Sequence, residues 1–162
     1  FLNAAFIVLE SVPEAKALII GDCSDGNIAY QNQIQKMVED SEFSGRVIMT
    51  GYVKDVSSMY EIMEVCVHTS IEPEPFGLVI IEAMANRVPV IASDLGAPKE
   101  IITDGTNGYI VSPNQAQALA DKIIQLLTDD KQREKMGENA RLHVQEHYND
   151  ENYAKIIEKI YG

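Results

Sequence analysis

The chain has 162 residues, 46% of them hydrophobic, and carries a formal net charge of −12. Its length suffices for one compact domain with a buried core, and its apolar content excludes a disordered segment. The acidic balance argues against nucleic-acid binding, because contact with a phosphate backbone needs clustered Lys and Arg side chains.

Helical and extended patterns alternate along the chain at short intervals. Apolar residues at helical spacing indicate helices, and short continuous apolar runs indicate strands. In chain order, the first predicted elements are a helix at 2–12, a strand at 17–21, a helix at 28–38, a strand at 47–50, a helix capped by Asp55 at 55–63 and a strand at 65–69. They are followed by a helix at 78–86, a strand at 88–92, one helical turn at 99–102, a strand at 109–111, and helices at 115–127, 131–147 and 150–161.

The predicted strands carry apolar residues at successive positions rather than at alternate ones. Strands buried on both faces have this pattern, and short strand–helix alternation is typical of parallel sheets. We therefore predict an α/β fold, a Rossmann-like parallel sheet flanked by helices, as a single domain over residues 1–162.

Cys23 and Cys66 are the two cysteines, and neither belongs to a CxxC pair or a metal-binding spacing. We interpret them as small buried thiols of a protein in a reducing compartment. No apolar run has membrane-spanning length, and no basic-then-apolar leader opens the chain. Because the sequence begins inside a helical pattern, we expect it to be part of a longer protein.

Several motifs of common enzyme classes are absent from the sequence. There is no P-loop, GxGxxG fingerprint, GxSxG elbow or HExxH pair. His143 and His147 stand one helical turn apart, which we interpret as a solvated helix face. His68 ends a predicted strand near the candidate site, where it acts either as a ligand contact or as a structural histidine.

Two carboxylates, Glu74 and Glu82, are separated by seven residues. Glu74 lies in a proline-flanked loop before a helix, and Glu82 lies within that helix among apolar neighbours. From pattern alone, Glu74 would complement the helix dipole and Glu82 would face solvent. In the functional alternative, both lie in the crevice at the strand ends and accept hydrogen bonds from vicinal hydroxyls of a sugar or ribose.

Gly77 starts the same helix. It has no Cβ and so allows close approach of a ligand, and we expect the amides of Gly77, Leu78 and Val79 to be unpaired at the helix start. Such amides can hold a diphosphate or a sugar hydroxyl. A second glycine turn, Gly96-Ala97, either adds to this cradle or is an ordinary strand-to-helix turn.

These residues and their neighbours resemble the donor-binding half of retaining glycosyltransferases of family four, which have the GT-B fold. Glu74 and Glu82 match the family's Glu-x7-Glu motif. The other matching blocks are 21–22, 51–53, 75–78, 82–85, 89–93, 96–102 and 104–108. The resemblance extends over residues 1–162 and rests on the order of these blocks rather than on one motif.

The resemblance implies a nucleotide-diphosphate sugar as substrate, with no metal or other cofactor. Glu74 would be the catalytic residue and hold hydroxyls of the transferred sugar, whereas Glu82 would bind the ribose. Backbone amides at the helix start would face the sugar and diphosphate, and Val53 would contact the base through its backbone. The expected donor-binding residues are Gly21, Val53, Glu74, Phe76, Gly77, Leu78, Val79 and Glu82.

The chain departs from the family pattern in three respects. Arg87 replaces a helix-end glycine, and the left-handed cap that glycine favours is less easy for Arg. The family's first strand, with the Arg and Lys that grip the diphosphate, and its acceptor domain would both precede Leu2. Because the first strand of a doubly wound sheet is usually central, we expect an interrupted sheet, closed by another chain's strand or by local rearrangement.

We therefore predict the donor-binding domain of a retaining glycosyltransferase that acts on a glycan, glycolipid or polysaccharide. By itself the domain should bind donor weakly and transfer nothing. The alternatives are a nucleotide-sugar epimerase of the same fold and a non-catalytic regulatory module. The expected partners are the donor, a glycan or lipid-linked acceptor, and a second copy through exposed sheet edges. We expect a cytoplasmic location, either free or peripheral to the inner face of the membrane.

Overall fold

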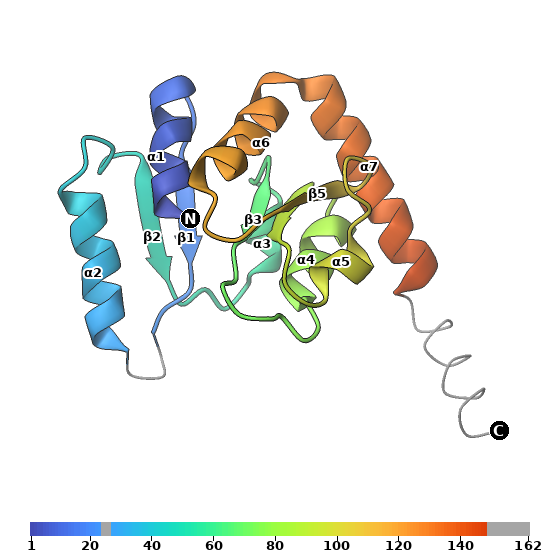
Figure 1. The fold of residues 1–162 in the computed structure, drawn as a ribbon, viewed down its shortest axis with the longest axis horizontal. Coiled ribbons are helices and arrows are strands. Elements are labelled where there is room, and N and C mark those ends of the chain that lie inside the picture. The colour runs from blue at the N-terminus through green and yellow to red at the C-terminus, as the bar shows by residue number, and fades with distance from the viewer. Residues whose placement is uncertain (24–26, 149–162) are drawn as a thin grey trace.

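The computed structural model describes residues 1–23 and 27–148, in which helices and strands alternate (Figure 1). The first elements are α1 (Leu2–Ser11), β1 (Ala17–Ile20), α2 (Ile28–Glu39), β2 (Val47–Gly51), α3 (Ser57–Tyr60) and β3 (Cys66–His68). They are followed by α4 (Leu78–Ala85), β4 (Val90–Ser93), α5 (Pro98–Ile101), β5 (Gly108–Val111), α6 (Ala116–Thr128) and α7 (Asp130–His147). The predicted alternation is confirmed, and the helix predicted at 150–161 lies outside the described residues.

The strands form two parallel sheets. β1 pairs with β2, and in the second sheet β4 lies between β3 and β5. The parallel pairing and the flanking helices confirm the predicted Rossmann-like α/β class. Within the described residues no ladder joins β1 to β3, so the predicted interruption of the sheet is also confirmed.

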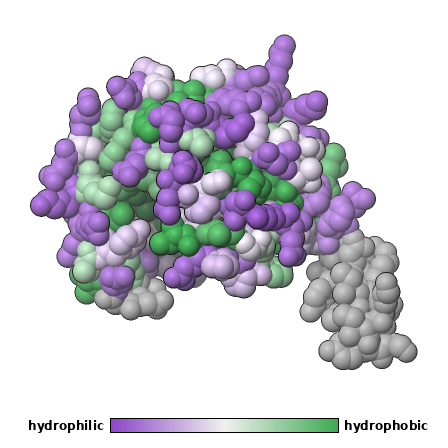
Figure 2. Space-filling view, in the orientation of Figure 1, coloured by the Kyte–Doolittle hydropathy of each residue, from purple (hydrophilic) through white to green (hydrophobic). Residues whose placement is uncertain are grey.

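A cavity of about 590 Å3 lies between the two sheets. Its walls include all of β1 and residues 65–67 in and beside β3, together with apolar residues of α1 and α6. Among the described residues β1 pairs only with β2, and β3 only with β4, so each strand has a free edge. On the face drawn in Figure 2, apolar residues reach the surface among polar ones.

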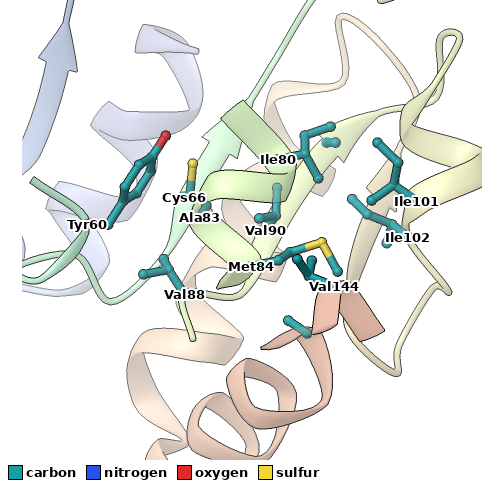
Figure 3. Packing of buried hydrophobic residues seen from close by; sticks show 12 residues of the cluster. Tyr60, Cys66, Ile80, Ala83, Met84, Val88, Val90, Ile101, Ile102 and Val144 are labelled. Atoms are coloured by element: carbon teal, nitrogen blue, oxygen red, sulfur yellow. The ribbon is translucent and has the colours of Figure 1, made fainter. Parts of the chain in front are cut away.

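β4 is the most deeply buried strand, and alternate residues pack against different helices. Val90 and Ala92 belong to a core cluster with residues of α4 and α7, part of which is drawn in Figure 3. Ile91 belongs to a second cluster with residues of α1 and α6. Because successive side chains of a strand point to opposite faces, helices cover this sheet on both sides.

The predicted helix at 55–63 is too long, because α3 ends at Tyr60 and the chain continues in a turn. Its apolar spacing was interpreted as a helical stripe, and Tyr60 is indeed buried. The Asp55 side chain also accepts from the Ser58 amide, at 3.4 Å, as a capping residue does. Turns and irregular chain over residues 61–65 then connect α3 to β3, which starts at Cys66.

Arg87 adopts the left-handed conformation itself, with φ 62°. The Val88 amide donates to the Ala83 carbonyl and the Arg87 amide to the Met84 carbonyl, each at 3.0 Å, which is the Schellman pattern of a helix end. The Arg87 Nε also lies 2.8 Å from the Glu138 carboxylate on α7. The helix end therefore keeps the geometry that glycine would favour, despite the larger side chain.

The two cysteines differ in their surroundings. Cys66 is buried, and burial raises the pKa of its thiol to about 11. An apolar site opposes the charged thiolate, so this cysteine is an inert core residue as predicted. Cys23 is partly exposed, so the prediction of burial is wrong for that residue.

Candidate functional site

The backbone of Glu74 is held against the turn that follows β4. The Glu74 amide donates to the Leu95 carbonyl at 3.2 Å, and the Ala97 amide donates to the Glu74 carbonyl at 2.8 Å. Gly96 lies between these bonds with φ 79°, and a Cβ there would be 2.4 Å from the Glu74 carbonyl oxygen. Gly96 therefore permits close contact with the Glu74 backbone, a role that neither alternative from the sequence included.

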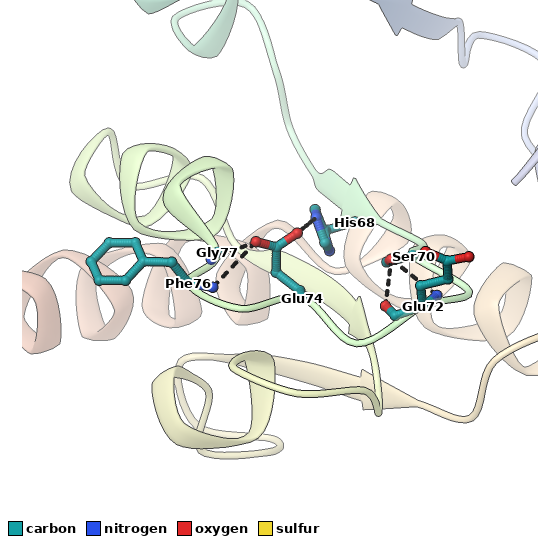
Figure 4. A network of polar contacts seen from close by, with 6 residues as sticks. All are labelled: His68, Ser70, Glu72, Glu74, Phe76 and Gly77. Carbon is teal, nitrogen blue, oxygen red and sulfur yellow. Dashed lines mark hydrogen bonds and ion pairs between the residues drawn. The ribbon is translucent and has the colours of Figure 1, made fainter. Parts of the chain in front are cut away.

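The Glu74 side chain turns back onto the start of α4 (Figure 4). Its Oε1 accepts from the Gly77 amide at 3.0 Å and from the Phe76 amide at 3.3 Å. These two hydrogen bonds are the main reason that the pKa of Glu74 lies below its usual range. The expectation that the Gly77 amide is unpaired is wrong in this structure, because Glu74 already occupies it.

His68, at the end of β3, contacts the other carboxylate oxygen. Its Nε2 lies 3.5 Å from Glu74 Oε2, and its Nδ1 is buried with no hydrogen-bond partner in the described part of the chain. A fully satisfied structural histidine would have partners for both nitrogens. His68 therefore belongs to the surroundings of Glu74 rather than to the core alone.

Glu82 lies within α4, and its side chain is exposed. The Tyr60 hydroxyl donates to Glu82 Oε2 at 3.1 Å. Burial of Tyr60, and secondly its hydrogen bond to Glu82, raise the pKa of the phenol. Glu82 is exposed, as the pattern alone predicted, but the pattern did not predict its hydrogen bond to the buried Tyr60.

Tyr60 is the site residue that the sequence interpretation missed. The helix predicted at 55–63 contains Tyr60 among its apolar positions, and the residue is only 4% exposed. A usable signal was its chemistry, because a buried tyrosine usually needs a hydrogen-bond partner for its hydroxyl. Nothing in the spacing identified that partner, which lies 22 residues further along the chain.

The remaining predicted residues fall into two groups. Gly21, Val53 and Val79 line the cavity between the sheets, together with Tyr60. Phe76, Gly77 and Leu78 lie with Glu74 at the start of α4, where the Phe76 and Leu78 side chains are exposed. The structure therefore places Glu74 directly before the first turn of α4, and Glu82 within that helix, hydrogen-bonded to Tyr60 of the cavity wall.

The arrangement can bind a polyhydroxylated ligand. Two carboxylates are held by partners of different kinds, backbone amides for Glu74 and a phenol for Glu82. Each carboxylate has lone pairs left to accept from hydroxyl groups. Within residues 1–23 and 27–148, no three His, Cys, Asp or Glu side chains gather as they would around a metal ion.

The chain is similar to known proteins over most of its length. The model of the family described as glycosyl transferases group 1 matches residues 1–143. N-acetyl-alpha-D-glucosaminyl L-malate synthase of Bacillus anthracis is 32% identical over 157 residues, and this match covers 97% of the chain but 40% of that enzyme. The chain thus spans less than half the length of this relative.

Solved structures show the same fold. The C-terminal domain of a group 1 glycosyl transferase (LpcC) from Francisella tularensis is 33% identical, with a TM-score of 0.85 over 93% of this chain and 78% of that one. TarM of S. aureus, in complex with UDP and alpha-GlcNAc-glycerol among its ligands, is 29% identical, with a TM-score of 0.84 over 99% of this chain and 32% of that one. The chain therefore belongs to the glycosyl transferases group 1 family and has the fold of the C-terminal domain of GT-B glycosyltransferases.

Proposed function

We propose that this chain binds the nucleotide-diphosphate sugar in a retaining glycosyltransferase, which transfers the sugar to a glycan, glycolipid or polysaccharide. The observation that carries the proposal is the fixed pair of carboxylates at α4, one held by amides and one by Tyr60. The structure of TarM with UDP supports it, because that chain has the same fold at 29% identity. Transfer of a sugar is the activity of the family to which the chain belongs.

Glu74 is the residue that we assign to the transferred sugar, as hydroxyl acceptor and catalytic group. Its pKa is lowered by the Gly77 and Phe76 amides, so at neutral pH it is a carboxylate, which only accepts hydrogen bonds. Its Oε1 is occupied by those amides, and its Oε2 faces His68. A sugar hydroxyl would therefore bind at Oε2, beside Nε2 of His68.

Glu82 is assigned to the ribose. Its Oε2 accepts from Tyr60, and Tyr60 lines the same cavity as Gly21, Val53 and Val79. A nucleoside placed between Glu82 and these residues would have its base toward the backbone of Val53. The diphosphate would then face the start of α4, where the amides of Phe76, Gly77, Leu78 and Val79 lie and the helix dipole favours negative charge.

Binding of the diphosphate would compete with an existing interaction. The Phe76 and Gly77 amides donate to Glu74 in this structure. We propose that donor binding redirects one or both amides to the ligand, while Glu74 turns its carboxylate to the sugar. Protein groups rather than a metal ion or cofactor would neutralise the diphosphate, with the Arg and Lys of the family pattern lying outside this chain.

The acceptor and the complete reaction are assigned to the longer protein. We propose that this chain alone binds donor weakly and transfers nothing, because the acceptor site is not part of residues 1–162. No described helix has the length and hydropathy needed to cross a membrane. We propose that the protein works in the cytoplasm or at the inner face of the membrane, which cell fractionation would test.

Titration calorimetry with UDP-, GDP- and ADP-sugars tests the proposal on the full-length protein. One donor should bind, and both Glu74→Gln and Glu82→Gln should weaken it by roughly tenfold or more, because hydrogen bonds to charged groups are the stronger ones. Glu72→Gln is the matched control: Glu72 is exposed in the same loop, and its side chain has no hydrogen bond or ion pair within the described residues.

Three outcomes separate the proposal from its rivals. Donor binding with transfer to an acceptor supports it. Formation of an epimer without any acceptor would identify a nucleotide-sugar epimerase. Absence of binding to every nucleotide sugar by the full-length protein would favour a non-catalytic module and refute the proposal.

Self-association is proposed for the chain in isolation. The free edges of β1 and β3 face an apolar cavity, and exposed strand edges pair readily with other chains. Sedimentation at increasing concentration should therefore show dimers or larger species of the 162-residue chain. A monomer at all concentrations would refute this part of the proposal.

A further inference from the structure

We infer that Tyr60 is a positioning residue, whose hydroxyl holds one oxygen of Glu82 so that the other oxygen accepts from the ligand's ribose hydroxyls. The inference rests on the proposed role of Glu82 as the ribose-binding residue. It adds a residue from another element, because Tyr60 ends α3 whereas Glu82 lies on α4.

The position of the hydroxyl is set by the core. The ring of Tyr60 is buried in the cluster that also contains Cys66, Ala83 and Val88, and Figure 3 shows these side chains around the same end of α4. A ring packed in this way cannot change its direction without disturbing the core. The hydroxyl is therefore a fixed point, to which the exposed carboxylate of Glu82 is hydrogen-bonded.

The hydroxyl also has one fixed role. A phenol has a single proton to donate, and Glu82 Oε2 receives it at 3.1 Å. Burial and the neighbouring carboxylate both oppose loss of that proton, so Tyr60 remains a donor at neutral pH. Tyr60 thereby engages one carboxylate oxygen of Glu82, and Oε1 is left to accept from a ribose hydroxyl.

The pair also connects the two parts of the site. Tyr60 lines the cavity that contains Gly21, Val53 and Val79, and its hydroxyl reaches the helix that starts beside Glu74. A nucleotide bound along this line would place its ribose next to the held carboxylate. Without the hydroxyl, Glu82 would sample several rotamers on the helix surface and lose part of its binding free energy on ordering.

The test compares Tyr60→Phe, Glu82→Gln and the double variant in the full-length protein. The probe is whichever of UDP, GDP and ADP binds in calorimetry, together with its 2′-deoxy and 3′-deoxy forms. Tyr60→Phe should weaken the ribonucleotide by roughly five- to tenfold. It should lower the affinity for at least one deoxy form clearly less, because that form lacks a hydroxyl group that would donate to Glu82. In the double variant, the loss should equal that of Glu82→Gln alone, because Tyr60 acts through Glu82.

Tyr109→Phe is the matched control, since Tyr109 is also buried and its hydroxyl is hydrogen-bonded, but it belongs to the other core cluster. It should leave the ratio of ribo to deoxy affinity unchanged. A general loss of stability in Tyr60→Phe, measured by thermal unfolding, would not change this ratio either.

Two negative results have different meanings. If Glu82→Gln does not weaken binding of the ribonucleotide, the proposed role of Glu82 is wrong, and so is the inference about Tyr60. The other result is that Glu82→Gln weakens binding of the ribonucleotide but Tyr60→Phe does not act through Glu82. Tyr60→Phe would then have no effect on affinity, lower the affinity for ribo and deoxy forms equally, or add its full loss to that of Glu82→Gln. Any of these would show that Tyr60 does not position Glu82.

Discussion

Replacing Gly96 by alanine should both destabilise the fold and displace Glu74. Gly96 has φ 79°, and a Cβ there would lie 2.4 Å from the Glu74 carbonyl oxygen and 2.9 Å from its amide nitrogen. Both contacts are to backbone, so no side-chain rotation can relieve them. The loop that carries Glu74 would have to move away from β4.

The expected magnitude has two parts. A left-handed conformation costs a residue with a Cβ about 1–2 kcal/mol. Forcing an extra methyl group into a packed site costs roughly 1–3 kcal/mol. Gly96→Ala should therefore lower the free energy of unfolding by about 2–5 kcal/mol, the sum of both contributions.

Gly105→Ala separates the two contributions. Gly105 has φ 74°, close to that of Gly96, but a Cβ there would meet nothing within 4 Å. This control should therefore lose only the conformational part, about 1–2 kcal/mol. The difference between the two variants measures the clash with Glu74.

Urea unfolding of both variants and donor titration of the full-length protein are the assays. Gly96→Ala should unfold at clearly lower urea than Gly105→Ala, and it alone should weaken donor binding, because it displaces Glu74. Equal midpoints for the two variants, or unchanged donor affinity in Gly96→Ala, would refute the reasoning.

Three further predictions concern the ends of α4. Gly137→Ala should lower the free energy of unfolding by about 1–3 kcal/mol, measured with urea, because the added Cβ would lie 2.1 Å from the Arg87 carbonyl oxygen; this clash should exceed the gain from the better helix propensity of alanine. The control Gly45→Ala places its Cβ in open space and should change stability little. Arg87→Gly should stabilise by up to about 1 kcal/mol, because relief of the left-handed conformation exceeds the exposed ion pair with Glu138, and a loss of stability would contradict this. The Gly77 and Phe76 amides hold the pKa of folded Glu74 below its usual range, so the contribution of this carboxylate to stability is present above its pKa in the unfolded chain and is lost as pH falls through the lowered value. The difference in urea midpoint between the wild type and Glu74→Gln should thus shrink from pH 7 to about pH 3, and a constant difference would refute it.

Local pattern predicted most of the elements, and its one large error is informative. The apolar run of β4 was recognised because a strand buried on both faces is apolar at successive positions, and all of Val90–Ser93 is buried. The helix predicted at 55–63 was too long because helical spacing of apolar residues does not reveal where the chain must turn toward the next strand. For Arg87, the sequence indicated that a left-handed cap is less easy for arginine, but it did not predict that arginine would take this conformation itself.

The sequence by itself determined the α/β class through local periodicity. The family resemblance carried by the order of its short motifs implied the interruption of the sheet and singled out Glu74 and Glu82 as candidate site residues. Only the tertiary structure decided what holds the carboxylates. The Tyr60–Glu82 hydrogen bond joins residues 22 apart in the chain, and the Glu74 backbone is paired with the turn around Gly96. Contacts between elements this distant arise from how helices and strands pack together, and no local pattern records them. For the same reason, the occupation of the Gly77 amide by Glu74 appeared only when the loop was seen folded onto its helix.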